Sequence, residues 1–176
     1  RTANRYIKHI YYGNRVPLLD NAGHSPINLL QQDLQNAGWM FEVVFDYGEH
    51  DLTDPKPGDN GTWFCRNDPF SSCRQGFDVR SYRLCQRVLM YHHFPAEAGI
   101  GQNCLVCSID IAYRNIRGIA ADRQLGHPIA SFIASVTQSG YIRANGGGYS
   151  KKSLPPVAFE YSQAVISSQV QQLDLG

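Results

Sequence analysis

The sequence lacks a long apolar run and carries almost no net charge. No stretch of about 18 uncharged apolar residues occurs, which excludes a predicted transmembrane helix. Lysine and arginine number 16 against 15 acidic residues, and the formal net charge of +1 excludes nucleic-acid binding through the field of the whole chain. The first residues also lack the basic and then apolar pattern of a secretory signal.

Cysteine is sparse and odd in number. The five cysteines stand at irregular spacings, whereas a small disulfide scaffold has a dense and even set. Pairing of Cys65 with Cys73 is one alternative, and free thiols are the other. Cysteine usage therefore leaves the redox compartment open, and the glycosylation motif at residues 60–62 (Asn-Gly-Thr) is compatible with secretion.

The composition is that of one folded, strand-rich domain. The 176 residues are 43% hydrophobic, 11% aromatic and only 18% charged, which excludes intrinsic disorder. Aromatic residues suit pleated sheets. We therefore expect a single β-rich domain over residues 1–176. Because the sequence starts with Arg1 and not with methionine, we expect it to be a fragment of a larger protein.

Alternation of apolar and polar residues predicts several strands. The clearest is 39–47, which ends at Gly48 before a proline-containing loop at 49–61. Residues 79–94 also alternate, with a bend or bulge predicted near Gln86. The further predicted strands are residues 5–12, 105–113, 129–141 and 156–165.

One short helix is predicted between residues 26 and 37. Ser25 suits the N-cap, Pro26 the first turn, and Gly38 the position after the C-cap. Its apolar positions are Ile27, Leu30 and Leu34. The fold class is therefore all-β, mainly antiparallel and meander or sandwich-like, with at most one or two short helices.

Acidic residues and a histidine gather where the 39–47 strand ends. Carboxylates and imidazole in one short segment suit a hard cation or acid–base chemistry, although the order is not that of a calcium loop. The alternative, which we favour, is a set of hydrated residues that follow a strand. The candidate metal ligands are Asp46, Glu49, His50 and Asp51, with Asp54 beyond them.

A second candidate is a zinc site made of His92, His93, Cys104 and Cys107. Zinc takes nitrogen and sulfur ligands in tetrahedral geometry. Cys107 falls within the predicted strand, however, and residues three apart in a strand point to opposite faces unless a bulge intervenes. We therefore favour structural thiols, and adjacent histidines also cannot serve the same site.

Other motifs give no catalytic centre and no cofactor. Ser71 and Ser72 follow Asp-Pro-Phe in a turn predicted at residues 68–72, and no nucleophile elbow occurs there. Residues 146–148 (Gly-Gly-Gly) predict a hairpin rather than a phosphate loop. Basic residues interleaved with aromatics either form a patch for sugar, phosphate or a partner, or are solvated and paired with acids, which we favour; they are Arg66, Arg74, Arg80, Arg83 and Arg87.

Taken together, these segments resemble one family. The similarity runs through residues 5–8 (RYIK), 12–15 (YGNR), 41–51 (FEVVFDYGEHD), 66–72 (RNDPFSS), 76–77, 80–94, 135–141 (SVTQSGY), 153–156 and 159–162 (FEYS). This sequence resembles the SpvB-like N-terminal region of insecticidal Tc-toxin B components, also called the virulence plasmid B protein family. Cys65, Cys73 and Cys107 depart from the family pattern, as do residues 18–38.

The resemblance implies a structural role. In that family the region precedes a propeller, and the B component joins a C component to form a hollow cocoon around a toxic effector. The expected partners are therefore the propeller and the C component. The segment is expected to be part of a secreted toxin and not to insert into a membrane itself. The ADP-ribosyltransferase activity associated with the name SpvB resides in a separate C-terminal domain and needs a Glu-x-Glu pair, which this sequence lacks.

Two alternatives remain beside this scaffold role. One is a self-contained lectin-like or protein-binding β module, with carbohydrate as its ligand. The other is an enzyme based on the acidic segment from Asp46 to Asp54.

Overall fold

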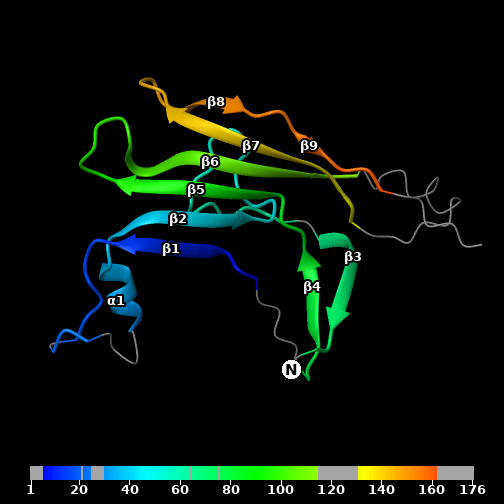
Figure 1. The fold of residues 1–176 in the computed structure, drawn as a ribbon, viewed down its shortest axis with the longest axis horizontal. Helices are drawn as coiled ribbons and strands as arrows, with labels where there is room; N and C mark the ends of the chain where they lie inside the picture. The colour runs from blue at the N-terminus through cyan, green and yellow to red at the C-terminus, as the bar shows by residue number, and fades with distance from the viewer. Residues whose placement is uncertain are drawn as a thin grey trace, which may run out of the picture.

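The computed structural model describes residues 6–20, 22–24, 30–63, 65–74, 76–114 and 131–161. These residues form nine strands and one helix, so the predicted all-β class is confirmed (Figure 1). The elements are β1 (His9–Asn14), α1 (Gln31–Asn36), β2 (Trp39–Asp46), β3 (Cys65–Ser72), β4 (Val79–Arg83), β5 (Arg87–Phe94), β6 (Gly101–Tyr113), β7 (Ile133–Arg143), β8 (Tyr149–Ser153) and β9 (Val157–Ala158).

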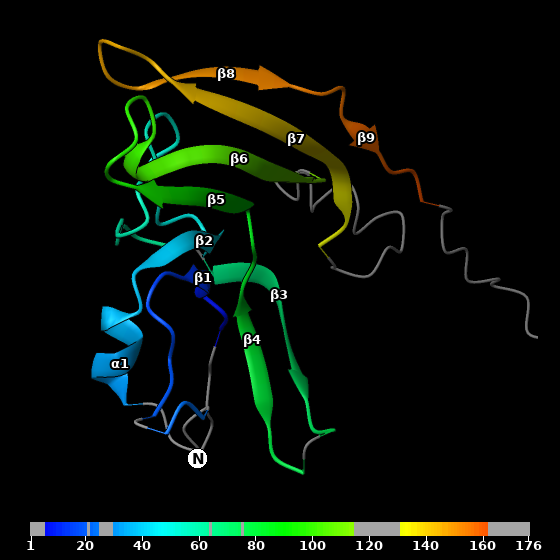
Figure 2. The same cartoon turned by 60° about the vertical axis from the view of Figure 1, so that its left-hand side comes forward.

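The main sheet is an antiparallel meander. Seven strands form it in the order β1-β2-β5-β6-β7-β8, and β9 pairs with β7 beyond the end of β8. Strands β3 and β4 form a separate two-stranded ladder, which extends away from the main sheet (Figure 2). Of the two predicted arrangements, the meander is the one that the described residues adopt.

Most predicted strands are confirmed, with shifted ends. The segment at 39–47 is β2, 5–12 corresponds to β1, 105–113 lies within β6, and 129–141 corresponds to β7. In β2 the alternation corresponds to a difference in burial between the two sides of the strand. In the segment predicted at 156–165, only Val157–Ala158 is a strand, and residues 162–165 lie outside the described residues.

The segment at 79–94 breaks where a bend was predicted. Residues 84–86 separate β4 from β5, and the two strands belong to different sheets. The backbone N–H of Gln86 donates to the Asp46 carbonyl at 2.7 Å, which joins the start of β5 to the end of β2.

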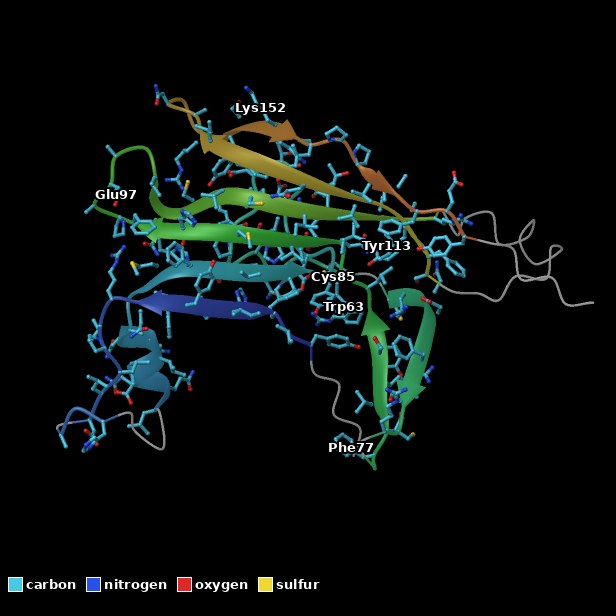
Figure 3. All side chains as sticks on the ribbon, viewed as in Figure 1. Trp63, Phe77, Cys85, Glu97, Tyr113 and Lys152 are labelled. Carbon is cyan, nitrogen blue, oxygen red and sulfur yellow. The ribbon has the colours of Figure 1, made fainter. Side chains whose placement is uncertain are left out.

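The predicted turn at residues 68–72 is wrong, because these residues belong to β3. Pro69 breaks the expected strand pattern, since it has no N–H for a ladder. Among the described residues β3 pairs with β4 alone, so one side of β3 needs no ladder N–H. The register is also irregular between Cys65 and Phe70, and a strand tolerates a proline at such a site. Phe77 stands at the tip of this hairpin, far from the main sheet, with 53% of its surface exposed (Figure 3).

The helix is shorter than predicted at its start. Leu30 is extended (ψ 152°), so α1 begins at Gln31, and the Asp33 carboxylate accepts the Leu30 N–H at 3.0 Å. The predicted N-cap Ser25 and the predicted first-turn residue Pro26 lie outside the described residues. Gly38 follows the helix with φ +63°, as predicted for a helix end. In the described part of the chain, no helix is long and apolar enough to cross a membrane.

The two faces of the main sheet differ in burial. On one face Val44, Leu89, Tyr91 and Leu105 form a fully buried core. The loop at residues 48–63 covers this face, and the Tyr91 hydroxyl donates to the Pro55 carbonyl in it at 2.9 Å. Apolar side chains of the opposite face remain half-buried: Val43, Phe45, Val88, Met90, Ile109 and Ile111.

Candidate functional site

The covered face also holds buried polar side chains, among them Glu42, Asp46, Arg87 and Ser108. Two of them form an ion pair, since Arg87 Nε donates to Asp46 Oδ2 at 2.7 Å. The other Asp46 oxygen accepts the N–H groups of Gly48 and His50, and Arg87 Nη2 donates to the carbonyls of His50 and Asp51. Every charged oxygen therefore has a protein partner, which is what a buried ion pair requires.

Glu49 and His50 lie beside this pair. Glu49 accepts hydrogen bonds from Lys8 at 3.0 Å and from Arg83 at 3.3 Å. Burial alone would raise the pKa of Glu49, but the hydrogen bonds from Lys8 and from backbone N–H groups outweigh it and lower that pKa. His50 uses both ring nitrogens, with Lys8 Nζ at 2.6 Å and the Lys56 carbonyl at 2.8 Å.

The structure brings Asp46, Glu49 and His50 together, and their side chains bond to other groups of the protein. Asp46, Glu49 and His50 are buried, so our expectation that they face water is wrong for these three. Asp51 is exposed and accepts the N–H groups of Thr53 and Asp54. Within the described residues, no group of three or more His, Cys, Asp or Glu side chains is placed to hold a metal ion.

The second metal candidate is also not assembled. His92 and His93 face opposite ways as predicted: His92 packs edge-on against Phe41, and His93 is buried. The ladder between β5 and β6 slips between Met90 and Tyr91, so the strict alternation assumed for Cys104 and Cys107 does not hold. The bulge that would let Cys104 and Cys107 point to the same side is therefore present. Both thiols are nevertheless free in the structure.

All five cysteines are free in the structure, which leaves the predicted alternative of a Cys65–Cys73 disulfide unformed. Both of these thiols are exposed. Burial, with a contribution from the Asp46 charge, raises the pKa of Cys85 to about 11.

We expect iodoacetamide at about pH 8 to modify Cys65 and Cys73 first and Cys85 only on unfolding. A pKa about three units above the pH leaves roughly one Cys85 in a thousand as the reactive thiolate. Peptide mass spectrometry at successive times measures the order, with the chain in concentrated guanidinium as the control. Early modification of Cys85 in the folded chain would contradict this environment.

Three of the five arginines of the predicted basic patch are paired with acids instead of exposed. The pairs are Arg66 with Asp68, Arg83 with Glu49, and Arg87 with Asp46. Arg83 also lies 4.3 Å from the centre of the Trp63 ring. Arg74 is exposed at the end of the β3–β4 hairpin. The favoured alternative of pairing with acids therefore describes most of this set, although burial replaces the expected solvation.

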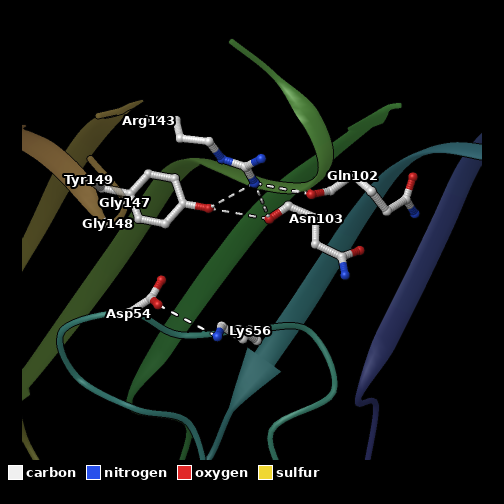
Figure 4. Close-up of a pocket in the computed structure, with 8 residues that line it drawn as sticks. All are labelled: Asp54, Lys56, Gln102, Asn103, Arg143, Gly147, Gly148 and Tyr149. Carbon is white, nitrogen blue, oxygen red and sulfur yellow. Dashed lines mark hydrogen bonds and ion pairs between the residues drawn. The ribbon is translucent and has the colours of Figure 1, made fainter. Parts of the chain in front are cut away.

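The predicted hairpin at residues 146–148 is confirmed, and β7 and β8 pair on either side of it. This hairpin lines a cavity of about 390 Å³ that no sequence motif indicated (Figure 4). Its lining residues are Asp54, Lys56, Gln102, Asn103, Arg143, Gly147, Gly148 and Tyr149. The cavity lies between the loop over the sheet, the start of β6 and the β7–β8 hairpin, so residues far apart in sequence form it.

A second cavity of about 300 Å³ shares Gln102 and Asn103 with the first. In its wall, Glu42 is buried between two histidines, with oxygens 2.6 Å from His9 Nδ1 and 3.0 Å from His93 Nε2. Burial and then the Glu42 charge raise the pKa of Tyr11 to about 12. The sequence analysis did not single out Glu42. The signal that could have indicated its burial is that Glu42 lies on the same face of β2 as Val44 and Asp46.

Comparison with known proteins supplies the family. Residues 1–94, more than half of the chain, match the family model described as "SpvB: Salmonella virulence plasmid 65kDa B protein". The chain belongs to the SpvB family. This confirms the resemblance drawn from the sequence.

Curated SpvB proteins are similar to part of the chain. The Mono(ADP-ribosyl)transferase SpvB proteins of Salmonella typhimurium, Salmonella choleraesuis and Salmonella dublin are each 39% identical to it over 102 residues, which is 56% of the chain. The aligned part makes up 16% of each relative, so the chain corresponds to a small share of those proteins.

Solved structures share the fold. The N-terminal domain of effector protein SpvB from Salmonella typhimurium strain LT2 superimposes with a TM-score of 0.60 and 32% identity, over 80% of this chain and 39% of that one. The TcdB2-TccC3-TEV crystal structure gives a TM-score of 0.61 and 33% identity, over 90% of this chain and 7% of that one. The SpvB-family chain therefore has the fold of a part of both proteins.

Proposed function

We propose that the chain is a non-enzymatic structural segment of a secreted Tc-toxin B-like subunit. In this role it forms part of the shell around a toxic effector, as the family resemblance implies. Residues 1–176 make one β-rich domain that precedes a propeller, and the propeller and the C component are its neighbours. Similarity to TcdB2-TccC3 over 90% of the chain supports this assignment.

The half-buried apolar face of the main sheet is the observation that carries the proposal. Strands β2, β5 and β6 lie in the middle of the sheet, where apolar side chains are normally covered. Val43, Met90 and Ile109 on these strands nevertheless keep partial exposure in the described residues. Apolar area exposed in this way favours packing against another surface, and other parts of the parent subunit provide one.

The transferase activity in the relatives' name is not proposed for this segment. The similarity to the N-terminal domain of SpvB supports this separation, and no Glu-x-Glu pair occurs in the sequence. An NAD glycohydrolase assay tests it directly: turnover by the purified chain that disappears in His50→Ala would overturn the non-enzymatic assignment.

We expect Ile109→Lys to weaken association of the chain with the remainder of its parent subunit at least about tenfold. The added charge would have to be buried in an apolar contact, and a tenfold loss corresponds to about 1.4 kcal/mol. Mixing the two parts and measuring complex formation by sedimentation velocity gives the affinity. Circular dichroism checks that the variant still folds.

Ala112→Lys is the matched control, because Ala112 is an exposed residue of the same strand, β6. It is expected to leave association unchanged. If the unsubstituted chain does not associate with the remainder of the subunit, or if both lysine variants associate equally well, the scaffold proposal is wrong.

A further inference from the structure

Arg143 in the first cavity is a cation without an acidic partner among the described residues. Its Nη2 donates to the carbonyls of Gln102 at 3.0 Å and Asn103 at 3.1 Å. It also lies 3.4 Å from the Tyr149 hydroxyl, and this hydrogen bond raises the pKa of Arg143 (Figure 4). These contacts fix the guanidinium without neutralising it, so it keeps the capacity to bind an anion.

The opposite wall carries a second cation that is only loosely paired. Lys56 Nζ lies 3.7 Å from Asp54 Oδ2, and both side chains are largely exposed. An exposed pair of this kind contributes little stability and can exchange partners. Two cations and one carboxylate leave the cavity with a single formal excess of positive charge, which matches one carboxylate better than a multiply charged phosphate.

Asn103 is held in an unusual backbone conformation between the two cavities. Its φ of +56° is the only positive value at a described residue other than glycine. Such a conformation is strained and persists where surrounding contacts enforce it. Here the Asn103 N–H donates to His93, and its carbonyl accepts from Arg143 and Tyr149. The side-chain amide is left without a protein partner in the described part of the chain, and Asn103 lines the cavity between Arg143 and Lys56 (Figure 4).

We propose that this cavity binds a sugar that bears a carboxylate, such as a uronic acid. Arg143 and Lys56 bind the carboxylate, while the Asn103 amide and Asp54 bind ring hydroxyls. The Tyr149 side chain supplies an aromatic wall, and about 390 Å³ is in the range of small-molecule sites. The second cavity, which shares Gln102 and Asn103, offers space for a neighbouring sugar unit.

The test compares glucuronate with glucose, because the two differ only in the carboxylate. Isothermal titration of the chain is expected to show glucuronate binding at least about tenfold tighter than glucose, and Arg143→Gln is expected to remove that difference. Arg74→Gln, an exposed arginine at the hairpin end, is the matched control and should bind as the unsubstituted chain does.

Asn103→Gly separates ligand binding from folding. Glycine accepts a positive φ without strain, so this variant should unfold at no lower temperature while it loses the amide and binds glucuronate several-fold more weakly. Four results would each overturn the proposal: no measurable glucuronate binding, equal affinity for glucose, equal affinity for inorganic phosphate, or unchanged binding in both Arg143→Gln and Asn103→Gly.

Discussion

Arg87→Met is expected to lower the free energy of unfolding by about 3–5 kcal/mol, the range for removal of one partner from a buried ion pair. Asp46 has 1% of its side chain exposed and would lose its ionic partner. The two carbonyls that Arg87 Nη2 satisfies, at His50 and Asp51, would lose their donor as well. Urea titration followed by tryptophan fluorescence measures the change.

Two further variants separate the ion pair from the packing of the arginine side chain. Arg74→Met makes the same substitution at an exposed site and should change stability by less than about 0.5 kcal/mol. Asp46→Leu combined with Arg87→Met removes both charges and should recover a large part of the loss. A loss below about 1 kcal/mol in Arg87→Met alone would show that Asp46 does not depend on this partner.

Leu89→Ala is expected to lower the free energy of unfolding by about 2–5 kcal/mol. Leu89 is fully buried, and among the described residues it shares the core cluster with Val44, Tyr91 and Leu105. A backbone hydrogen bond joins the two ends of the loop that covers this face. Gly61 donates to the Glu49 carbonyl, and a Cβ on Gly61 would lie 2.6 Å from that oxygen. The loop therefore has little freedom to collapse into the cavity that the substitution leaves.

Leu52→Ala provides the matched control, since Leu52 lies in the same loop region with 84% of its surface exposed. Its substitution should change stability by less than about 0.5 kcal/mol. Equal effects at Leu52 and Leu89 in urea titrations would mean that the two sites do not differ in burial as described.

The strands that alternate strongly could be predicted from sequence, and the irregular ones could not. In β2 the alternation at residues 39–46 reflects a real difference between faces. In β3, Pro69 hid a strand, because a proline is excluded from ladders only where its missing N–H is needed. The bend near Gln86 was predicted, but the assignment of β4 and β5 to different sheets was not. That assignment involves the bond from Gln86 to the end of β2, a contact between residues distant in sequence.

Which face of β2 is buried could not be read from residue type. The face with Glu42 and Asp46 is the buried one, while the aromatic face with Phe41 and Phe45 stays half-buried. Burial of these acids depends on partners from other elements, such as Arg87 on β5. For the same reason the Arg143 cavity left no local signal, because its walls come from three separate segments of the chain.

The direct pairing of β2 with β5 makes the β3–β4 hairpin an excursion between two neighbouring strands. The bond from Gln86 to Asp46 closes the base of this excursion, and the hairpin forms its own ladder. Residues could therefore be added or removed near Phe77 without a change in the register of the main sheet. The length of the β3–β4 hairpin can therefore change in evolution independently of the main sheet.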